Sequence, residues 1–368
     1  MSKAFARLGA VLFGLMVMAA APAVQADEAS PADMARFIAG MEPSAGSPLQ
    51  ALTQERSWRA HSKHFKRAWQ ALDQRQLSKI ASWQNQNLPE HRDLMLYLFS
   101  GPDFLYANAF FPDASTYVLT GLEPVGPIPD VTRFSRGGRA EALRNLRVSM
   151  QTIVNISFFI TKKMKQQLKA GGLDGTLPVL YVFLARAGKT ITDVELVTLN
   201  PDGTLEARGG KKQKGSSPGV KITFSGSDGT SRTLYYFSTD LSNWGLKKSG
   251  FLEFVEGLGS AGSLVKSASY LLHSGNFTTA RDFLFRQSDV ILQDDSGIPL
   301  RHFDRDSWKL QPFGNYLGPI EIFASRYQRD MKRLFSRANR TPIDFGFGYK
   351  WRKNQSNVLL ATRRPVTD

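Results

Sequence analysis

Residues 94–122 read LMLYLFSGPDFLYANAFFPDASTYVLTGL. Two apolar runs, 94–99 and 116–122, flank a turn at Ser100 to Asp103 and a short helical stretch over 104–111. A strand, a turn, a helix and a second strand in this order indicate a β-α-β unit. The stretch therefore predicts an α/β fold, in which helices flank a central sheet.

The segment from Ser100 to Glu123 resembles the first β-α-β unit of class I methyltransferases, where a glycine loop leads to a strand that ends in an acid. The resemblance covers this unit alone. The run of glycines is missing, and Pro102 removes a backbone donor that such a loop uses. It therefore implies the α/β architecture and no cofactor.

The rest of the chain extends this architecture to a mixed α/β fold with a central mixed sheet, flanking helices and an N-terminal helical segment. Hairpin signals around Asn200-Pro201-Asp202-Gly203 and Ser227-Asp228-Gly229 predict an antiparallel block over residues 191–238. Further strands are expected over 179–185, 251–256, 290–293, 343–351 and 357–362, and helices over 140–168, 263–273, 279–286 and 319–336.

The N-terminus follows the pattern of an export signal. Lys3 and Arg7 precede an apolar stretch over 8–21, which is too short to span a bilayer, and Val24-Gln25-Ala26 offers a cleavage site. We expect cleavage after Ala26 and a periplasmic or secreted protein with no later transmembrane segment. The expected organisation is a signal peptide over 1–26, a helical segment over 27–90 and a mixed α/β domain over 91–368.

Composition limits the possible functions. The chain has 368 residues, 42% of them hydrophobic, and no cysteine, which excludes disulfides, thiolate metal sites and cysteine nucleophiles. Its net charge is +15, and removal of Lys3 and Arg7 with the signal lowers it to +13. Outside the cytoplasm such a charge attracts anionic envelope polymers rather than nucleic acid, or it serves only to keep the protein soluble. The sequence leaves the oligomeric state open.

Two features could bind an envelope component. The loop around Lys211, Lys212 and Lys214 is basic and could bind an anionic polymer, or could be a solvated loop tip. In the expected strand 343–351 four aromatic residues alternate with Gly346, Gly348 and Lys350 and would share one face, as a platform for sugars or an apolar partner, or as one side of the core. These four residues are Phe345, Phe347, Tyr349 and Trp351.

Titratable residues are densest after the expected strand 290–293. Asp294 and Asp295 end that strand and His302 follows, so they are the candidate catalytic residues of a hydrolase. Glu123 and Asp103 also end strands, and they could join this site if those strands are neighbours. The alternative is a polar turn with local hydrogen bonds.

Two further segments have alternative interpretations. Residues 257–262 form a literal G-x-G-x-x-G, but Glu253 and Glu256 precede it and no suitable acid follows, so we expect a plain glycine-rich loop and no cofactor. Residues 53–87 predict a helix with an apolar aromatic face and a basic face, which docks on the main body or lies on a membrane surface.

No metal site is expected. The favoured function is non-catalytic binding of an anionic or glycan envelope component, and the alternative is a carboxylate/His-based hydrolase of such a polymer.

Overall fold

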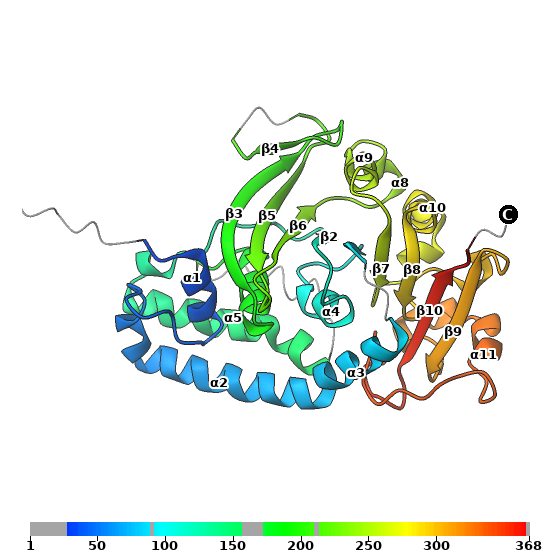
Figure 1. Ribbon diagram of the computed structural model, residues 1–368, viewed down its shortest axis with the longest axis horizontal. Coiled ribbons are helices and arrows are strands. Elements are labelled where there is room, and N and C mark those ends of the chain that lie inside the picture. The colour runs from blue at the N-terminus through cyan, green and yellow to red at the C-terminus, as the bar shows by residue number, and fades with distance from the viewer. Residues whose placement is uncertain (1–27, 89–91, 157–171, 210–212, 366–368) are drawn as a thin grey trace, which may run out of the picture.

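The computed structural model describes residues 28–88, 92–156, 172–209 and 213–365 (Figure 1). One mixed sheet of ten strands crosses the molecule in the order β4-β3-β5-β6-β2-β1-β7-β8-β10-β9. This confirms the expected α/β class with a central mixed sheet. The strands are β1 (Leu94–Tyr97), β2 (Thr116–Gly121), β3 (Thr190–Leu199), β4 (Leu205–Ala207), β5 (Ser217–Ser225), β6 (Ser231–Ser238), β7 (Ala261–Val265), β8 (Ser288–Gln293), β9 (Trp308–Gly314) and β10 (Asn357–Arg363).

The middle of the sheet is parallel and both ends are antiparallel. Strands β6, β2, β1, β7 and β8 run in the same direction. The predicted hairpins β3/β4 and β5/β6 form one end, and they are joined because β3 also pairs with β5. At the other end β10 pairs antiparallel with both β8 and β9. Because parallel strands end at the same edge, the loops after the five central strands meet on one side of the molecule.

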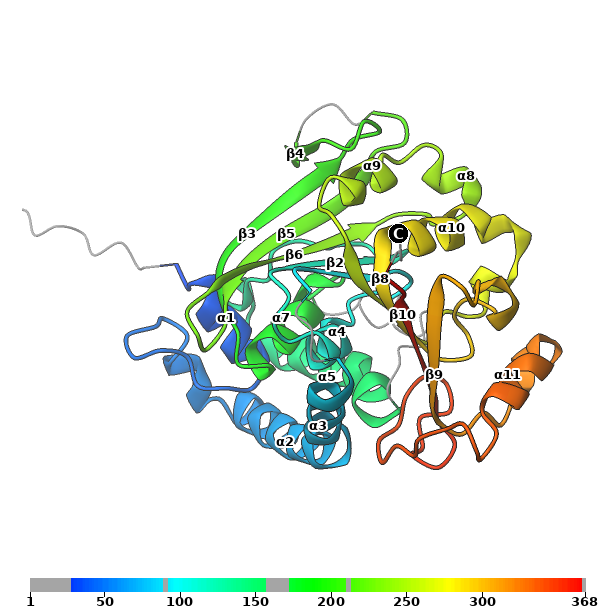
Figure 2. The same cartoon turned by 45° about the vertical axis from the view of Figure 1, so that its right-hand side comes forward.

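Helices cover both faces of the sheet (Figures 1 and 2). The sheet separates two hydrophobic clusters, one on each face. Successive side chains of β1 point to opposite faces, so Met95 and Tyr97 belong to one cluster and Leu94 and Leu96 to the other. One face is covered by α1 (Pro31–Ile38), α2 (Arg56–Leu72), α3 (Ser78–Asn87), α4 (Phe104–Phe110), α5 (Arg136–Ile156) and α7 (Leu177–Arg186). The other carries α8 (Asn243–Leu246), α9 (Phe251–Glu256), α10 (Thr278–Gln287) and α11 (Arg329–Leu334).

The expected strand over 179–185 is wrong, because this stretch forms α7. Pro178 stands in the first turn of the helix, and every residue from Leu177 to Ala185 is buried. A helix that is buried on all sides has no polar face, so its apolar run has the same appearance as a central strand. The helix packs against α1 and β3 within the first hydrophobic cluster.

Three other expectations are corrected. Residues 251–256 form the helix α9, and the expected helix 263–273 begins instead as the strand β7. Residues 343–351 form no strand, because the backbone turns at Gly348, where φ is +71°. Phe345 and Phe347 pack around Phe110 in the core, so the four rings share no exposed face. Strand β10 pairs with β8 and with β9, and the sequence did not predict β9.

The expected helix over 319–336 is two short pieces, a 3₁₀ turn at Glu321–Arg326 and α11. The helix expected over 140–168 corresponds to α5 up to Ile156, and 157–171 lie outside the described residues. Within the described ranges, no helix combines the length and the apolar character that crossing a bilayer requires. Residues 1–26, the expected signal peptide, are not among them.

Candidate functional site

A cavity lies at the carboxyl edge of the parallel strands, where the chain reverses its direction of winding. Strand β1 has β2 on one side and β7 on the other, so the chain proceeds first to one side of β1 and later to the other. Ligands of open α/β sheets bind in the crevice at such a switch point. The cavity has a volume of about 180 Å³, which corresponds to roughly six water molecules at liquid density.

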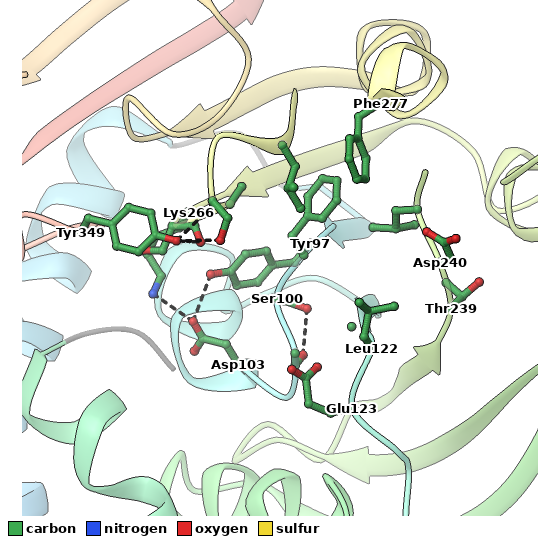
Figure 3. A pocket seen from close by; sticks show the side chains of 18 residues that line it. Tyr97, Ser100, Asp103, Leu122, Glu123, Thr239, Asp240, Lys266, Phe277 and Tyr349 are labelled. Atoms are coloured by element: carbon green, nitrogen blue, oxygen red, sulfur yellow. Dashed lines mark hydrogen bonds and ion pairs between the residues drawn. The ribbon is translucent and has the colours of Figure 1, made fainter. Parts of the chain in front are cut away.

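The loops after four parallel strands supply most of the cavity wall (Figure 3). On one side lie Lys266, Asp103 and Tyr349, and on the other lie Asp240 and Phe277. The residues that line the cavity are Tyr97, Phe99, Ser100, Gly101 and Asp103 after or in β1, Gly121, Leu122 and Glu123 at β2, Thr239, Asp240 and Leu241 after β6, Lys266, Ser267, Ala268, Ser269 and Leu271 after β7, and Phe277 and Tyr349.

A buried ion pair closes one side of the cavity. Nζ of Lys266 lies 3.0 Å from Oδ2 of Asp103, and their side chains are only 1% and 3% exposed. The hydroxyl of Tyr97 donates to the same Oδ2 at 3.0 Å, while the backbone N–H of Tyr106 donates to Oδ1 at 3.2 Å. Burial raises the pKa of Asp103, and Lys266 opposes that rise. Because Asp103 offsets its charge, Lys266 does not make the cavity a site for anions.

Two further carboxyl groups, Glu123 and Asp240, line the cavity. Glu123 is buried, with its carboxyl group against Gly121. Asp240 is exposed and accepts hydrogen bonds from the backbone N–H and the hydroxyl of Ser242, both at 2.9 Å. Within the described ranges neither carboxyl group forms an ion pair. The cavity therefore offers hydrogen-bond acceptors to a ligand that carries donors.

Backbone strain is concentrated around the same cavity. Among the described residues, four that are not glycine adopt a left-handed backbone, with φ between 51° and 60°. Three of them, Phe99, Ser267 and Ser269, line the cavity, and the fourth, Tyr270, follows Ser269. Such conformations cost on the order of 1–3 kcal/mol each and gather at binding and catalytic sites. The strain supports the assignment of this cavity as the functional site.

Asp294 lies outside the cavity and accepts hydrogen bonds from the backbone of the strained loop after β7. Its carboxyl group accepts hydrogen bonds from the backbone N–H of Ser267 at 3.2 Å and from that of Tyr349 at 3.3 Å. A side chain at Gly348 would collide with this carboxyl group. Burial, followed by the neighbouring charge of Asp295, raises the pKa of Asp294 to about 7. Asp294 therefore joins the loop after β7 to the loop around residue 348.

The structure does not bring the three candidate catalytic residues together in the cavity. Asp294 and Asp295 are both buried and neither lines it. Asp295 accepts from the hydroxyl of Tyr270 at 2.6 Å and from Nδ2 of Asn357 at 2.9 Å. His302 ends a 3₁₀ turn, its pKa is lowered by burial and by Arg281, and no hydrogen bond joins it to either aspartate in the described part of the chain.

The candidate binding residues have different positions. Lys211 and Lys212 lie outside the described residues, and Lys214 is exposed between β4 and β5. Tyr349 lines the cavity, where its hydroxyl donates to the carbonyl of Ser267 at 2.9 Å. Trp351 is partly exposed and does not line the cavity.

Sequence reasoning placed Asp103 and Glu123 at strand ends but missed Lys266, Ser267 and Asp240. Lys266 and Ser267 follow β7 and fall within the stretch 263–273 that was expected to be a helix. Asp240 follows the antiparallel block predicted over 191–238, so a polar residue just after a strand was the available signal. The G-x-G-x-x-G over 257–262 connects the helix α9 to the strand β7, the reverse of the strand-to-helix order that dinucleotide binding requires.

Comparison with known proteins does not assign a family. No family model matches the chain, no curated protein matches its sequence, and no solved structure matches its fold. Among the described residues no group of three or more His, Asp or Glu side chains is arranged to hold a metal ion. The fold and the cavity define an α/β protein with a small polar pocket at the carboxyl edge of its sheet.

Proposed function

We propose that this is an exported protein that binds a sugar ring of an envelope glycan in the cavity without transforming it. The observation that carries the proposal is the pair of carboxyl groups, Glu123 and Asp240, that line the cavity without an ion-pair partner among the described residues. Sugar hydroxyls donate hydrogen bonds, and bonds to a charged acceptor are the stronger kind. Export is supported by the pattern of residues 1–26.

Aromatic side chains complete this pocket. Tyr97, Phe277 and Tyr349 line the cavity and offer apolar ring surface beside the acceptors. Small-ligand sites combine such apolar walls with a few polar groups that fix orientation. An acidic sugar is disfavoured, because its carboxylate would meet Glu123 and Asp240 while Lys266 is already paired with Asp103.

The proposal is tested by saturation-transfer NMR and calorimetry with neutral, amino and uronic-acid sugars. We expect binding of neutral or amino sugars, weakened about tenfold or more by Glu123→Gln, because the variant replaces a charged acceptor by a neutral one. Glu206→Gln changes an exposed carboxyl group on β4 and serves as the control. Preferential binding of uronic acids, or equal affinities of the two variants, contradicts the proposal.

The second candidate is a carboxylate-based hydrolase of the same glycan. The observation that favours it is the left-handed backbone at Phe99, Ser267, Ser269 and Tyr270, since strain of this kind also gathers at active sites. In this case Glu123 and Asp240 are the carboxyl groups next to the substrate. Release of shorter saccharides from a glycan that binds, and its loss in Glu123→Gln, would place the hydrolase ahead of the binding protein.

A further inference from the structure

Helix α2 is entirely free of acidic residues. Its 17 residues, Arg56–Leu72, read RSWRAHSKHFKRAWQAL, and they contain five Lys or Arg side chains. The acid before the helix, Glu55, is bound to Arg139 at 2.6 Å, and the next acid, Asp73, lies beyond the last turn. The helix therefore has positive charge along its length with no internal compensation.

The five cations lie on one side of the helix. At 3.6 residues per turn they fall within an arc of about 100° and extend over about 16 Å. The opposite side is formed by Trp58, His61, Phe65, Trp69 and Leu72, all buried against the body of the protein. We call the five cations the α2 stripe; its members are Arg56, Arg59, Lys63, Lys66 and Arg67.

The charges of the α2 stripe are available to a partner. All five side chains are exposed, and none forms an ion pair within the ranges that the structure describes. Arg59 donates a hydrogen bond to Oε1 of Gln54 at 2.5 Å. Because this partner is a neutral amide, it does not offset the positive charge of Arg59. In Figure 1 α2 lies along the lower edge of the molecule, with α5 on the side toward the sheet. The stripe can therefore meet a large partner.

Helix α5 packs against α2 and adds two further arginines near it. Arg147 of α5 lies beside the two histidines of α2, with its guanidinium 3.1 Å from Nδ1 of His61. Arg144 is exposed one turn earlier, 4.0 Å from Glu141. Exposed cations on two neighbouring helices suit an extended anionic surface better than one strand of a polymer.

We propose that the α2 stripe docks the protein on an anionic phospholipid membrane by charge alone. Each Lys or Arg near such a surface adds to the attraction, which extends over about one Debye length. The aromatic side of α2 is buried in the core, so the helix does not insert its apolar face into the bilayer. Docking of this kind is independent of what the cavity binds.

The test is co-sedimentation with vesicles of phosphatidylcholine alone or mixed with phosphatidylglycerol. We expect binding to the mixed vesicles only, and loss of binding as salt is raised. The triple variant Lys63→Gln, Lys66→Gln, Arg67→Gln should bind on the order of 100-fold more weakly. The matched control removes three exposed cations elsewhere, by Arg305→Gln, Lys309→Gln and Lys332→Gln, and should bind nearly as the wild type does.

Three results overturn the proposal. Equal losses in the two triple variants would show that net charge, and not the α2 stripe, attracts the protein. If the wild-type protein does not bind the mixed vesicles, or binds both kinds of vesicle equally, electrostatic docking on an anionic membrane is excluded. Retention on soluble polyphosphate without vesicle binding would assign the stripe to a linear polyanion instead. Urea unfolding of each variant confirms that it is folded.

Discussion

The ammonium group of Lys266 and the carboxyl group of Asp103 form an ion pair of 3.0 Å, although the two residues lie 163 positions apart in the chain. They come from the loops that follow the adjacent strands β7 and β1.

 The pair is almost wholly buried at the cavity wall, and the hydroxyl of Tyr97 donates to the same carboxyl group. Two charges that are taken out of water stabilise a fold only while both remain. The pair therefore fixes the loops after β1 and β7 relative to each other.

Removing one partner of this pair should be costly. Lys266→Met leaves the carboxyl group of Asp103 buried without its cation, and we expect the free energy of unfolding to fall by roughly 3–5 kcal/mol. The double variant Lys266→Met, Asp103→Asn should recover more than half of that loss, because the amide still accepts from Tyr97 without a charge. Urea unfolding of the four proteins measures the coupling. Additive losses would contradict this account of the pair.

Asp294 should make stability fall as pH rises. Its pKa is raised to about 7, first by burial and then by Asp295, whereas the unfolded chain titrates near 3.8. Between these values the folded state holds the additional proton, so the free energy of unfolding decreases toward pH 7, by at most about 1.4 kcal/mol per pH unit. Asp294→Asn should lack this slope. Parallel pH profiles for the variant and the wild type would show that Asp294 does not titrate as described.

His61 should act in the opposite direction. Burial lowers its pKa to about 3, although the hydrogen bond that its Nε2–H donates to the carbonyl of Ile38 at 2.7 Å opposes this fall. The unfolded chain takes up a proton near pH 6.5, so the folded state loses stability as pH falls from 6.5 toward 3. His61→Gln keeps a donor and an acceptor but cannot titrate. Its free energy of unfolding should therefore decline less over this range, as measured by urea unfolding at several pH values.

A methyl group at Gly121 should disturb the cavity. The added Cβ would lie 2.9 Å from Cα of Gly101 and would collide with the carboxyl group of Glu123. We expect Gly121→Ala to cost roughly 1–3 kcal/mol and to weaken sugar binding, because it displaces an acceptor. The control is Gly275→Ala, where the new Cβ meets nothing within 4 Å. Unchanged calorimetric affinity in Gly121→Ala would remove Glu123 from the binding site.

The local pattern of the sequence was sufficient for much of the fold. The β-α-β unit at 94–122 appears as β1, α4 and β2, and both predicted hairpins lie in one antiparallel block. Alternating apolar residues and turn chemistry act within a few residues, so they can be recognised without a structure. Where the apolar run was buried on all sides, as in α7, the pattern was ambiguous and the expected strand was wrong.

The sequence by itself determined the α/β class, the hairpins, and the positions of Asp103 and Glu123 after strands. Only the tertiary structure decided that β1 lies between β2 and β7, which brings Lys266 to Asp103 and forms the cavity. It also placed Asp294 and Asp295 behind the cavity wall rather than in it. Strand pairing joins residues that are far apart in the chain, and no local periodicity specifies which strand edges will meet.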